Sequence, residues 1–301
     1  MKLTSWRYAY ALIAIAITII SVLGLLRQLN ELPPTDYWWP VSSRLEYLAI
    51  AISLAILQFT VAAKIYISAL TPNETRMRMK LLGVFFLSQA GKYAPGRIWS
   101  PFIQKLAIGN GEKISTIFFA NILVFSSVII SQIIIGLGAL VNFLIGPLIA
   151  IFSMLIFFAL SMSIASLLFS RNSFRSWEVF RFFSNQGNRI ELAKNILLLL
   201  SIGLATWLSF YSGWLGYSSD EGLALVGATS LSIMIGYLSV LPAALGVRDA
   251  AFILMKEIPW PLPIDQMAVL AIQSRVFMFL VDGLTASLGL LVVLVARRQR
   301  S

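Results

Sequence analysis

The chain has 301 residues, of which 58% are hydrophobic and only 12% are charged, and its mean hydropathy is +0.85. This composition excludes a soluble globular domain and predicts a protein that has lipid as its solvent. The chain contains no cysteine and no histidine, which excludes disulfides, thiolate nucleophiles, imidazole bases and the usual zinc sites. We attribute the net charge of +10 to membrane topology rather than to nucleic-acid binding, because most of the excess Lys and Arg residues stand at the ends of apolar runs.

Several apolar runs are long enough to form a membrane-spanning helix, which needs about 20 residues. The first run follows a basic start, but it is long and lacks a clear small-x-small cleavage site, so we expect an uncleaved span rather than a signal peptide. In chain order the runs are Tyr8–Leu26, Leu45–Leu70, Ser115–Val141, Leu148–Phe169, Ile196–Tyr217 and Met267–Ala296. They predict an all-α, polytopic membrane protein with a single integral membrane domain, residues 1–301.

Two further apolar segments, Leu81–Ile108 and Gly222–Ile258, are each interrupted by a motif that combines proline, glycine and arginine. The first motif reads SQAGKYAPGRIW (88–99) and the second reads GYLSVLPAALGVRD (236–249). A bilayer tolerates a broken backbone only where protein or a water-filled cavity satisfies the freed amide and carbonyl groups. Paired breaks in corresponding halves of a chain are typical of a transporter substrate site.

The placement of Lys and Arg residues predicts how the interrupted segments thread through the membrane. Cations cluster at the N-terminus, after the second apolar run, in the central linker 170–194 and at the C-terminus, and all four groups belong in the cytoplasm. The first interrupted segment must then return to the cytoplasm, and the second must return to the outside. We therefore expect about six full spans plus two re-entrant helix-break-helix hairpins, arranged as an inverted-topology repeat of residues 45–141 and 196–296. Both termini would lie on the cytoplasmic side of the inner membrane.

Charged residues at membrane depth are costly and usually face a partner or a substrate. An arginine after each break could hold phosphate oxygens with its guanidinium fork, and a helix restarting there would direct its amides at the same site. The expected substrate-binding residues are Lys92, Tyr93, Arg97, Arg248 and Arg275. The residues expected to shape the breaks are Gly91, Pro95, Gly96, Pro242 and Gly246. Candidate coupling groups or charge partners are Asp249, Asp282 and Gln89.

An alternative interpretation is that the cations pair with acids. Arg248 could form an ion pair with Asp249 or Asp282, and Arg275 and Asp282 stand on one face of the last helix. For the two carboxylates we favour such pairing over a role in proton coupling.

At the two motifs the sequence resembles the transmembrane region of the lysylphosphatidylglycerol synthase/flippase family. The family pattern is Lys-Tyr-x-Pro-Gly in the first half, Pro-Gly-Gly-x-Gly-x-Arg-Glu in the second half, and an arginine in the final helix. Residues 91–97 match the first motif closely. Residues 242–249 match the second with Ala243 and Ala244 in place of both glycines and Asp249 in place of Glu, and Arg275 matches the last position. The resemblance covers about residues 45–296.

The resemblance implies a lipid flippase that moves a phospholipid or lipid-linked saccharide and holds its phosphate headgroup with arginines. The fused aminoacyltransferase domain of some family members is absent from this chain, so we expect no catalysis, no cofactor and no metal. The expected partners are a lipid with an anionic phosphate headgroup and the bilayer, but no nucleic acid. The alternatives are a membrane-embedded lipid transferase and an accessory subunit of an envelope-polysaccharide assembly. The sequence leaves open whether the chain forms a homo-oligomer or binds other proteins of envelope biosynthesis.

A cysteine introduced at Gly111 tests the expected topology, because the chain has no other cysteine. If the first interrupted segment returns to the cytoplasm, a membrane-impermeant maleimide added from the periplasmic side will leave Gly111→Cys unlabelled. The control Ser219→Cys, in a loop that the charges place outside, should react. Labelling of Gly111→Cys from the periplasmic side would contradict the re-entrant hairpin.

Overall fold

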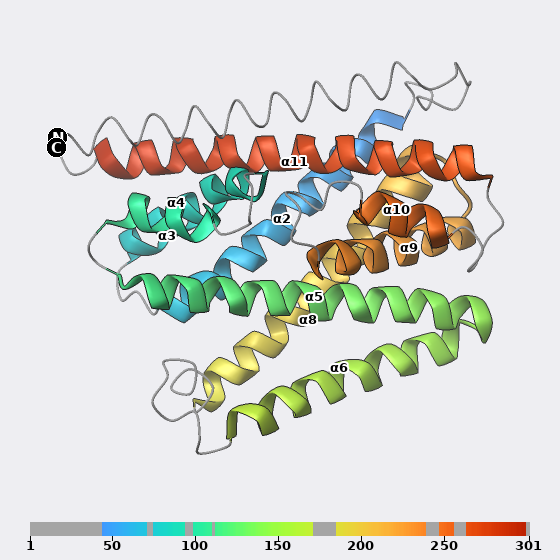
Figure 1. The fold of residues 1–301 in the computed structure, drawn as a ribbon, viewed down its shortest axis with the longest axis horizontal. Coiled ribbons are helices and arrows are strands. Elements are labelled where there is room, and N and C mark those ends of the chain that lie inside the picture. Colours follow the sequence, from blue (N-terminus) through green and yellow to red (C-terminus); the bar gives the residue numbers. More distant parts are fainter. Residues whose placement is uncertain are drawn as a thin grey trace.

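The computed structural model describes residues 44–70, 75–93, 99–109, 112–170, 185–238, 247–255 and 263–298, so the expected span Tyr8–Leu26 lies outside it. Every regular element in these ranges is a helix (Figure 1). In chain order they are α2 (Leu45–Leu70), α3 (Thr75–Ser88), the 3-10 helix η2 (Gln89–Tyr93), α4 (Trp99–Ile108), α5 (Ile114–Leu144), α6 (Pro147–Ser170), α8 (Gln186–Leu208), the π-helix η4 (Ser209–Trp214), α9 (Ser219–Leu238), α10 (Val247–Leu254) and α11 (Ile264–Arg298).

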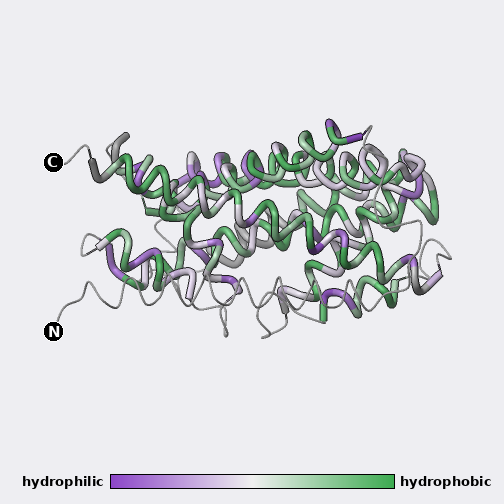
Figure 2. The backbone as a smooth tube through the Cα atoms, turned by 90° about the horizontal axis from the view of Figure 1, so that it is seen from above, coloured by the Kyte–Doolittle hydropathy of each residue, from purple (hydrophilic) through white to green (hydrophobic). Residues whose placement is uncertain are grey.

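Within the described ranges, four helices are long and apolar enough to cross a membrane, namely α2, α5, the continuous helix 186–214 and α11. Hydrophobic residues dominate along the helices, and hydrophilic residues appear only in short stretches (Figure 2). Helix α6 also carries large apolar side chains that are fully open to the surroundings, among them Leu148, Phe152 and Leu155. Surfaces of this kind are stable in lipid but not in water. The described residues therefore form an all-helical bundle that has the long apolar helices of a membrane protein.

Helix boundaries agree with the apolar runs except at α8. Helix α2 covers the expected run 45–70, whereas α5 and α11 extend beyond theirs by a few residues. Helix α8 begins at Gln186 rather than at Ile196, because the side chain of Asn185 accepts a hydrogen bond from the backbone N–H of Gly187 and caps the helix. The last part of the expected linker 170–194 is therefore helical.

The interrupted segments form two pairs of helices at opposite ends of the bundle. Helices α5 and α11 run the length of the molecule in opposite directions, with α3 and α4 at one end and α9 and α10 at the other (Figure 1). Helix α3 packs against α4, and α9 packs against α10. In addition, α3 packs along α11 and α9 packs along α5. The long helix of each half of the chain therefore packs against a helix of the other half.

Glycines bring the helices of these two cross-contacts close together. A Cβ atom added to Gly289 of α11 would lie 2.7 Å from the carbonyl oxygen of Gly83 in α3, and closer still to the backbone of Leu87. In the other cross-contact, a Cβ atom added to Gly227 of α9 would lie 2.6 Å from the Cβ of Ala139 in α5. Because lipid tails are as apolar as leucine, helices in a membrane associate through such close packing of small residues rather than through hydrophobic burial.

Two apolar clusters fill the ends of the bundle. One contains Ile65, Phe85 and Ile117 from α2, α3 and α5. The other is built around the aromatic side chains of the π-helix and its neighbours, where the ring centroids of Phe210 and Phe277 are 4.7 Å apart. Phe59, halfway along α2, packs against both clusters. The polar residues described next lie between these clusters, near the middle of the long helices.

Replacing Gly289 by Ala should destabilise the protein, because the new methyl group would collide with backbone atoms of α3 that cannot move aside independently. We expect a loss of about 1–3 kcal/mol, measured as a lower melting temperature in detergent micelles. Gly283→Ala is the matched control on the same helix, since a Cβ at Gly283 has no atom within 4 Å. Equal melting temperatures for the two variants would contradict the glycine-mediated contact.

Candidate functional site

A cavity of about 460 Å³ lies between the two helix pairs. Its lining residues come from α2, α3, η2, α4 and α5 on one side and from α9, α10 and α11 on the other. It contains six of the residues that the sequence marks as candidates. These are Gln89, Lys92, Tyr93, Arg248, Arg275 and Asp282. The structure thus brings both sequence motifs and the last helix to one place.

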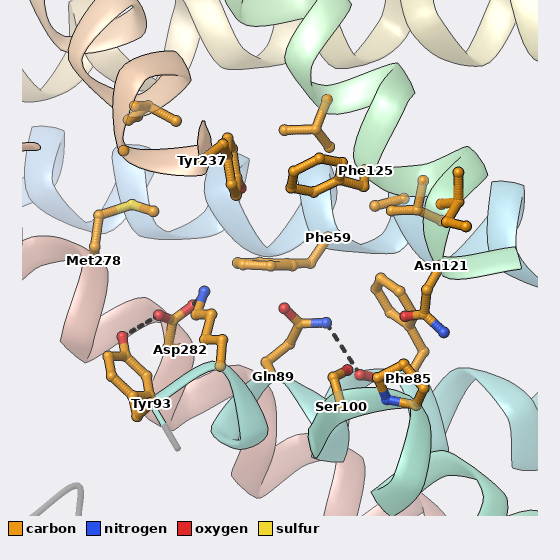
Figure 3. Close-up of a pocket in the computed structure, with 18 of the residues that line it drawn as sticks. Phe59, Phe85, Gln89, Tyr93, Ser100, Asn121, Phe125, Tyr237, Met278 and Asp282 are labelled. Carbon is orange, nitrogen blue, oxygen red and sulfur yellow. Dashed lines mark hydrogen bonds and ion pairs between the residues drawn. The ribbon is translucent and has the colours of Figure 1, made fainter. Parts of the chain in front are cut away.

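Asp282 of α11 is hydrogen-bonded through both of its carboxylate oxygens. Its carboxylate accepts hydrogen bonds from two consecutive residues of η2: Oδ1 is 2.6 Å from Nζ of Lys92, and Oδ2 accepts from the hydroxyl of Tyr93 (Figure 3). Asp282 is only 3% exposed. The carboxylate of Asp282 pairs with Lys92, whereas the sequence suggested Arg248 or Arg275 as its partner. The pairing ties the first motif to the last helix.

Aromatic rings surround the ammonium group of Lys92. Its Nζ lies 5.2 Å from the ring centroid of Phe59 and 5.9 Å from that of Tyr93. Tyr93 in turn stacks on Phe279, with 4.8 Å between the ring centroids. The contacts with Phe59 and Tyr93 hold the Lys92 ammonium group at the cavity wall. A cation near an aromatic face gains electrostatic stabilisation from that face.

A second ion pair joins α10 to α11. The Nε atom of Arg275 lies 2.5 Å from Oδ1 of Asp249, and the Arg275 side chain is almost completely buried. Arg275 and Asp282 share one face of α11, as the sequence indicated, but they bind different partners. Both carboxylates at this depth are therefore engaged by cations.

Arg248 differs from the other two cations. Its Nη2 donates a long hydrogen bond of 3.4 Å to the hydroxyl of Ser274. In the part of the chain that the structure describes, no carboxylate lies within ion-pair distance of Arg248, so the expected alternative of a pair with Asp249 or Asp282 is not formed. The guanidinium lines the cavity and has donors available for a ligand.

Neutral polar groups occupy the opposite end of the cavity. Asn121 of α5 donates a 2.6 Å hydrogen bond to Gln104 of α4, and Gln104 donates a 2.8 Å bond to Ser88 of α3. Gln104 itself has no exposed surface, whereas Asn121 and Ser100 line the cavity. Gln89 projects between this end and Asp282 (Figure 3).

Several expected site residues cannot be placed. Arg97, Pro95 and Gly96 lie in residues 94–98, and Pro242 and Gly246 lie in residues 239–246, both outside the described ranges. Their roles stay predictions.

Gly91, which is described, is buried beside α4. A Cβ atom at Gly91 would lie 3.1 Å from the backbone nitrogen of Ser100. A residue without a side chain therefore lets η2 approach the start of α4 closely.

The sequence did not single out Phe59, Phe279, Ser100 or Tyr237, which also line the cavity. A phenylalanine in an apolar helix does not by itself indicate a cavity position, because most such residues face lipid or core. Tyr237 stands inside the second motif and could have been considered on that ground.

No family model matches this chain, and neither the curated proteins nor the solved structures contain a match. The resemblance to the lysylphosphatidylglycerol synthase/flippase family therefore remains a prediction based on the motifs. Within the described ranges, no three Asp or Glu side chains gather as metal ligands. The functional argument depends on the cavity.

Replacing Asp282 by Asn should lower the melting temperature in detergent, because the ammonium of Lys92 would lose its counter-charge inside the protein. Removing one partner of a fully buried pair costs about 3–5 kcal/mol. We expect about 1–3 kcal/mol here, because the Lys92 side chain is 33% exposed and can turn toward the cavity.

The double variant Lys92→Met/Asp282→Asn should recover part of this loss, since it leaves no unpaired charge. A double variant that is no more stable than Asp282→Asn alone would show that the ion pair does not hold η2 against α11.

Proposed function

We propose that the chain is a flippase-like translocator of the cell inner membrane that moves a lipid with an anionic phosphate headgroup. The observation that supports this most directly is Arg248, a cation that lines a central cavity and has no carboxylate partner among the described residues. A guanidinium presents a planar fork of donors that matches the oxygens of a phosphate. Helix packing alone does not require a guanidinium without a carboxylate partner at this position.

The charge balance of the site supports an anionic ligand. Among the described residues of the site, three cations, Lys92, Arg248 and Arg275, meet two carboxylates, Asp249 and Asp282, which leaves one positive charge in excess. An uncompensated charge at membrane depth is costly and usually marks a substrate pathway. One phosphodiester would neutralise it.

The shape of the cavity supports a lipid rather than a small soluble anion. Ile122 and Phe125 of α5 line the cavity and are also 60% and 39% exposed, so its wall continues into the apolar outer surface of the bundle. A headgroup could bind inside while the acyl or polyprenyl tails stay in the bilayer.

The helix arrangement supports an inverted-topology repeat. The first repeat, residues 45–141, would comprise α2 to α5, and the second, residues 196–296, would comprise most of α8 and the helices from η4 to α11. Packing of α3 along α11 and of α9 along α5, with glycines in both contacts, is what two interlocked repeats of opposite orientation would produce. In this proposal the helix pairs α3–α4 and α9–α10 are re-entrant hairpins, and rocking of the repeats exposes the cavity to each leaflet in turn. Both termini would be cytoplasmic.

We favour translocation over the alternative of a lipid transferase. A transferase would need a base or a metal site, and Asp249 and Asp282 are both bound to cations. The chain has no cysteine or histidine that could take their place.

Arg248→Gln should reduce the translocation of acyl-labelled phosphatidylglycerol in proteoliposomes by at least about tenfold, because the phosphate would lose a charge-assisted hydrogen bond at the cavity. Dithionite quenching of the fluorescent label reports the rate at which lipid changes leaflet. Arg97→Ala should act in the same way if Arg97 also faces the cavity. Phosphatidylcholine, which carries no net charge, should move slowly with every variant.

Arg78→Gln is the matched control, because Arg78 is exposed on α3 and does not line the cavity. It should leave translocation unchanged. Size-exclusion profiles must show that all variants are folded. Wild-type rates in both Arg248→Gln and Arg97→Ala would rule out the phosphate site.

A further inference from the structure

The cavity has two chemically different ends. Asp282 and Tyr93 lie on one side, Ser100 and Asn121 lie on the other, and Gln89 projects between them (Figure 3). The described charged residues of the lining are Lys92, Arg248, Arg275 and Asp282, and they all belong to η2, α10 and α11. Among the described residues that α4 and α5 contribute, every polar group is an uncharged amide or hydroxyl.

The neutral end is built as a rigid polar surface. The amide of Asn121 is held by Gln104, with hydrogen bonds of 2.6 Å in one direction and 3.2 Å in the other. Gln104 also reaches Ser88 and Ser100, at 2.8 and 3.4 Å. The network therefore joins α3, α4 and α5 and fixes the Asn121 side chain at the cavity wall.

Two groups of this surface retain hydrogen-bonding capacity toward the cavity. Gln89 donates through Nε2 to the carbonyl oxygen of Phe85 at 3.2 Å, and its Oε1 accepts no hydrogen bond from any described residue. The hydroxyl of Ser100 accepts from Gln104, which leaves its own proton to donate. One acceptor and one donor thus face the same space.

Aromatic rings complete the neutral end. Phe118 and Phe125 line the cavity, and Phe125 makes an edge-to-face contact with Tyr237 at 5.1 Å between ring centroids. Aromatic faces next to amide and hydroxyl groups suit a ring that is apolar on its C–H face and carries hydroxyls at its edge.

We propose that the substrate is a lipid phosphodiester whose headgroup is an uncharged, hydroxyl-rich ring, such as a sugar or a cyclitol. This proposal rests on the proposed function and specifies its substrate class. The phosphate binds at Arg248, and the ring binds between Gln89, Ser100 and Asn121. A hydroxyl both donates and accepts, so it satisfies the Gln89 oxygen and the Ser100 hydroxyl together. The described groups of the neutral end include no cation that could bind a second phosphate. They also include no carboxylate that could bind an ammonium group.

Two acyl-labelled lipids of equal charge separate ring recognition from phosphate recognition. Phosphatidylinositol carries a hydroxyl-rich ring on its phosphodiester, whereas phosphatidylmethanol carries only a methyl group. In wild-type proteoliposomes we expect phosphatidylinositol to change leaflet at least about fivefold faster, a factor that one net hydrogen bond supplies. A parallel pair, mannosylphosphoryl and methylphosphoryl undecaprenol, tests whether the tail is polyprenyl or acyl. A preference for the ring-bearing member of either pair supports the proposal.

Gln89→Met and Ser100→Ala should each slow the ring-bearing lipid about fivefold more than they slow the methyl lipid. Size-exclusion profiles check that each variant is folded. Ser201→Ala is the matched control, because Ser201 is exposed on α8 and its hydroxyl bonds only within its own helix. It should retain the full preference.

The outcomes distinguish the two proposals. If wild-type protein moves both members of each pair equally, or if Gln89→Met and Ser100→Ala slow both members alike, ring recognition is wrong. The proposed function then still stands, provided that Arg248→Gln slows all the lipids. If Arg248→Gln and Arg97→Ala both leave every rate unchanged, the proposed function fails and the ring proposal fails with it.

Discussion

The carboxylate of Asp282 organises the centre of this protein. Both of its oxygens are occupied by donors from η2, so a short, non-α-helical stretch of the first half is anchored on the last helix. Polar groups at membrane depth must find partners inside the protein, because the surrounding hydrocarbon offers none. The anchor places Lys92 and Tyr93 on the cavity wall and leaves Arg248, on α10, as the cation without a carboxylate among the described residues. Together with the ion pair between Arg275 and Asp249, this contact accounts for both carboxylates that the described part of the site contains.

Packing supplies the frame around that contact. Glycines allow α3 to lie against α11 and α9 to lie against α5, while bulky aromatic and aliphatic side chains fill the two ends of the bundle. The described cavity lies between the two helix pairs. The arrangement of the bundle therefore leaves a chamber near its middle with a few polar side chains in a mainly apolar wall.

The cavity combines chemistry that is rarely useful to a structural core. Arg248, which has no acidic partner in the described part of the chain, meets fixed neutral amides and hydroxyls and aromatic faces in one volume of about 460 Å³. Buried polar groups stabilise a fold only when they are satisfied, so available donors and acceptors at this depth are costly unless a ligand uses them. This cost is the physical reason for regarding the cavity as a binding site for a lipid headgroup.

The sequence by itself determined the helical class, the lipid environment and the position of the two motifs, because apolar runs of spanning length and backbone-breaking residues are local properties. It also identified most of the charged residues of the cavity, since charges are rare in such runs.

The tertiary structure alone decided which of them pair. Lys92 and Asp282 are 190 residues apart, and Arg275 binds Asp249 rather than Asp282, although the latter shares its helix face. The start of α8 at a capped Gln186 and the cavity role of Phe59 were likewise not apparent from hydropathy. Ion pairing and cavity lining depend on how helices that are distant in the sequence pack together. The hydropathy of an apolar residue does not reveal whether it faces lipid, core or ligand.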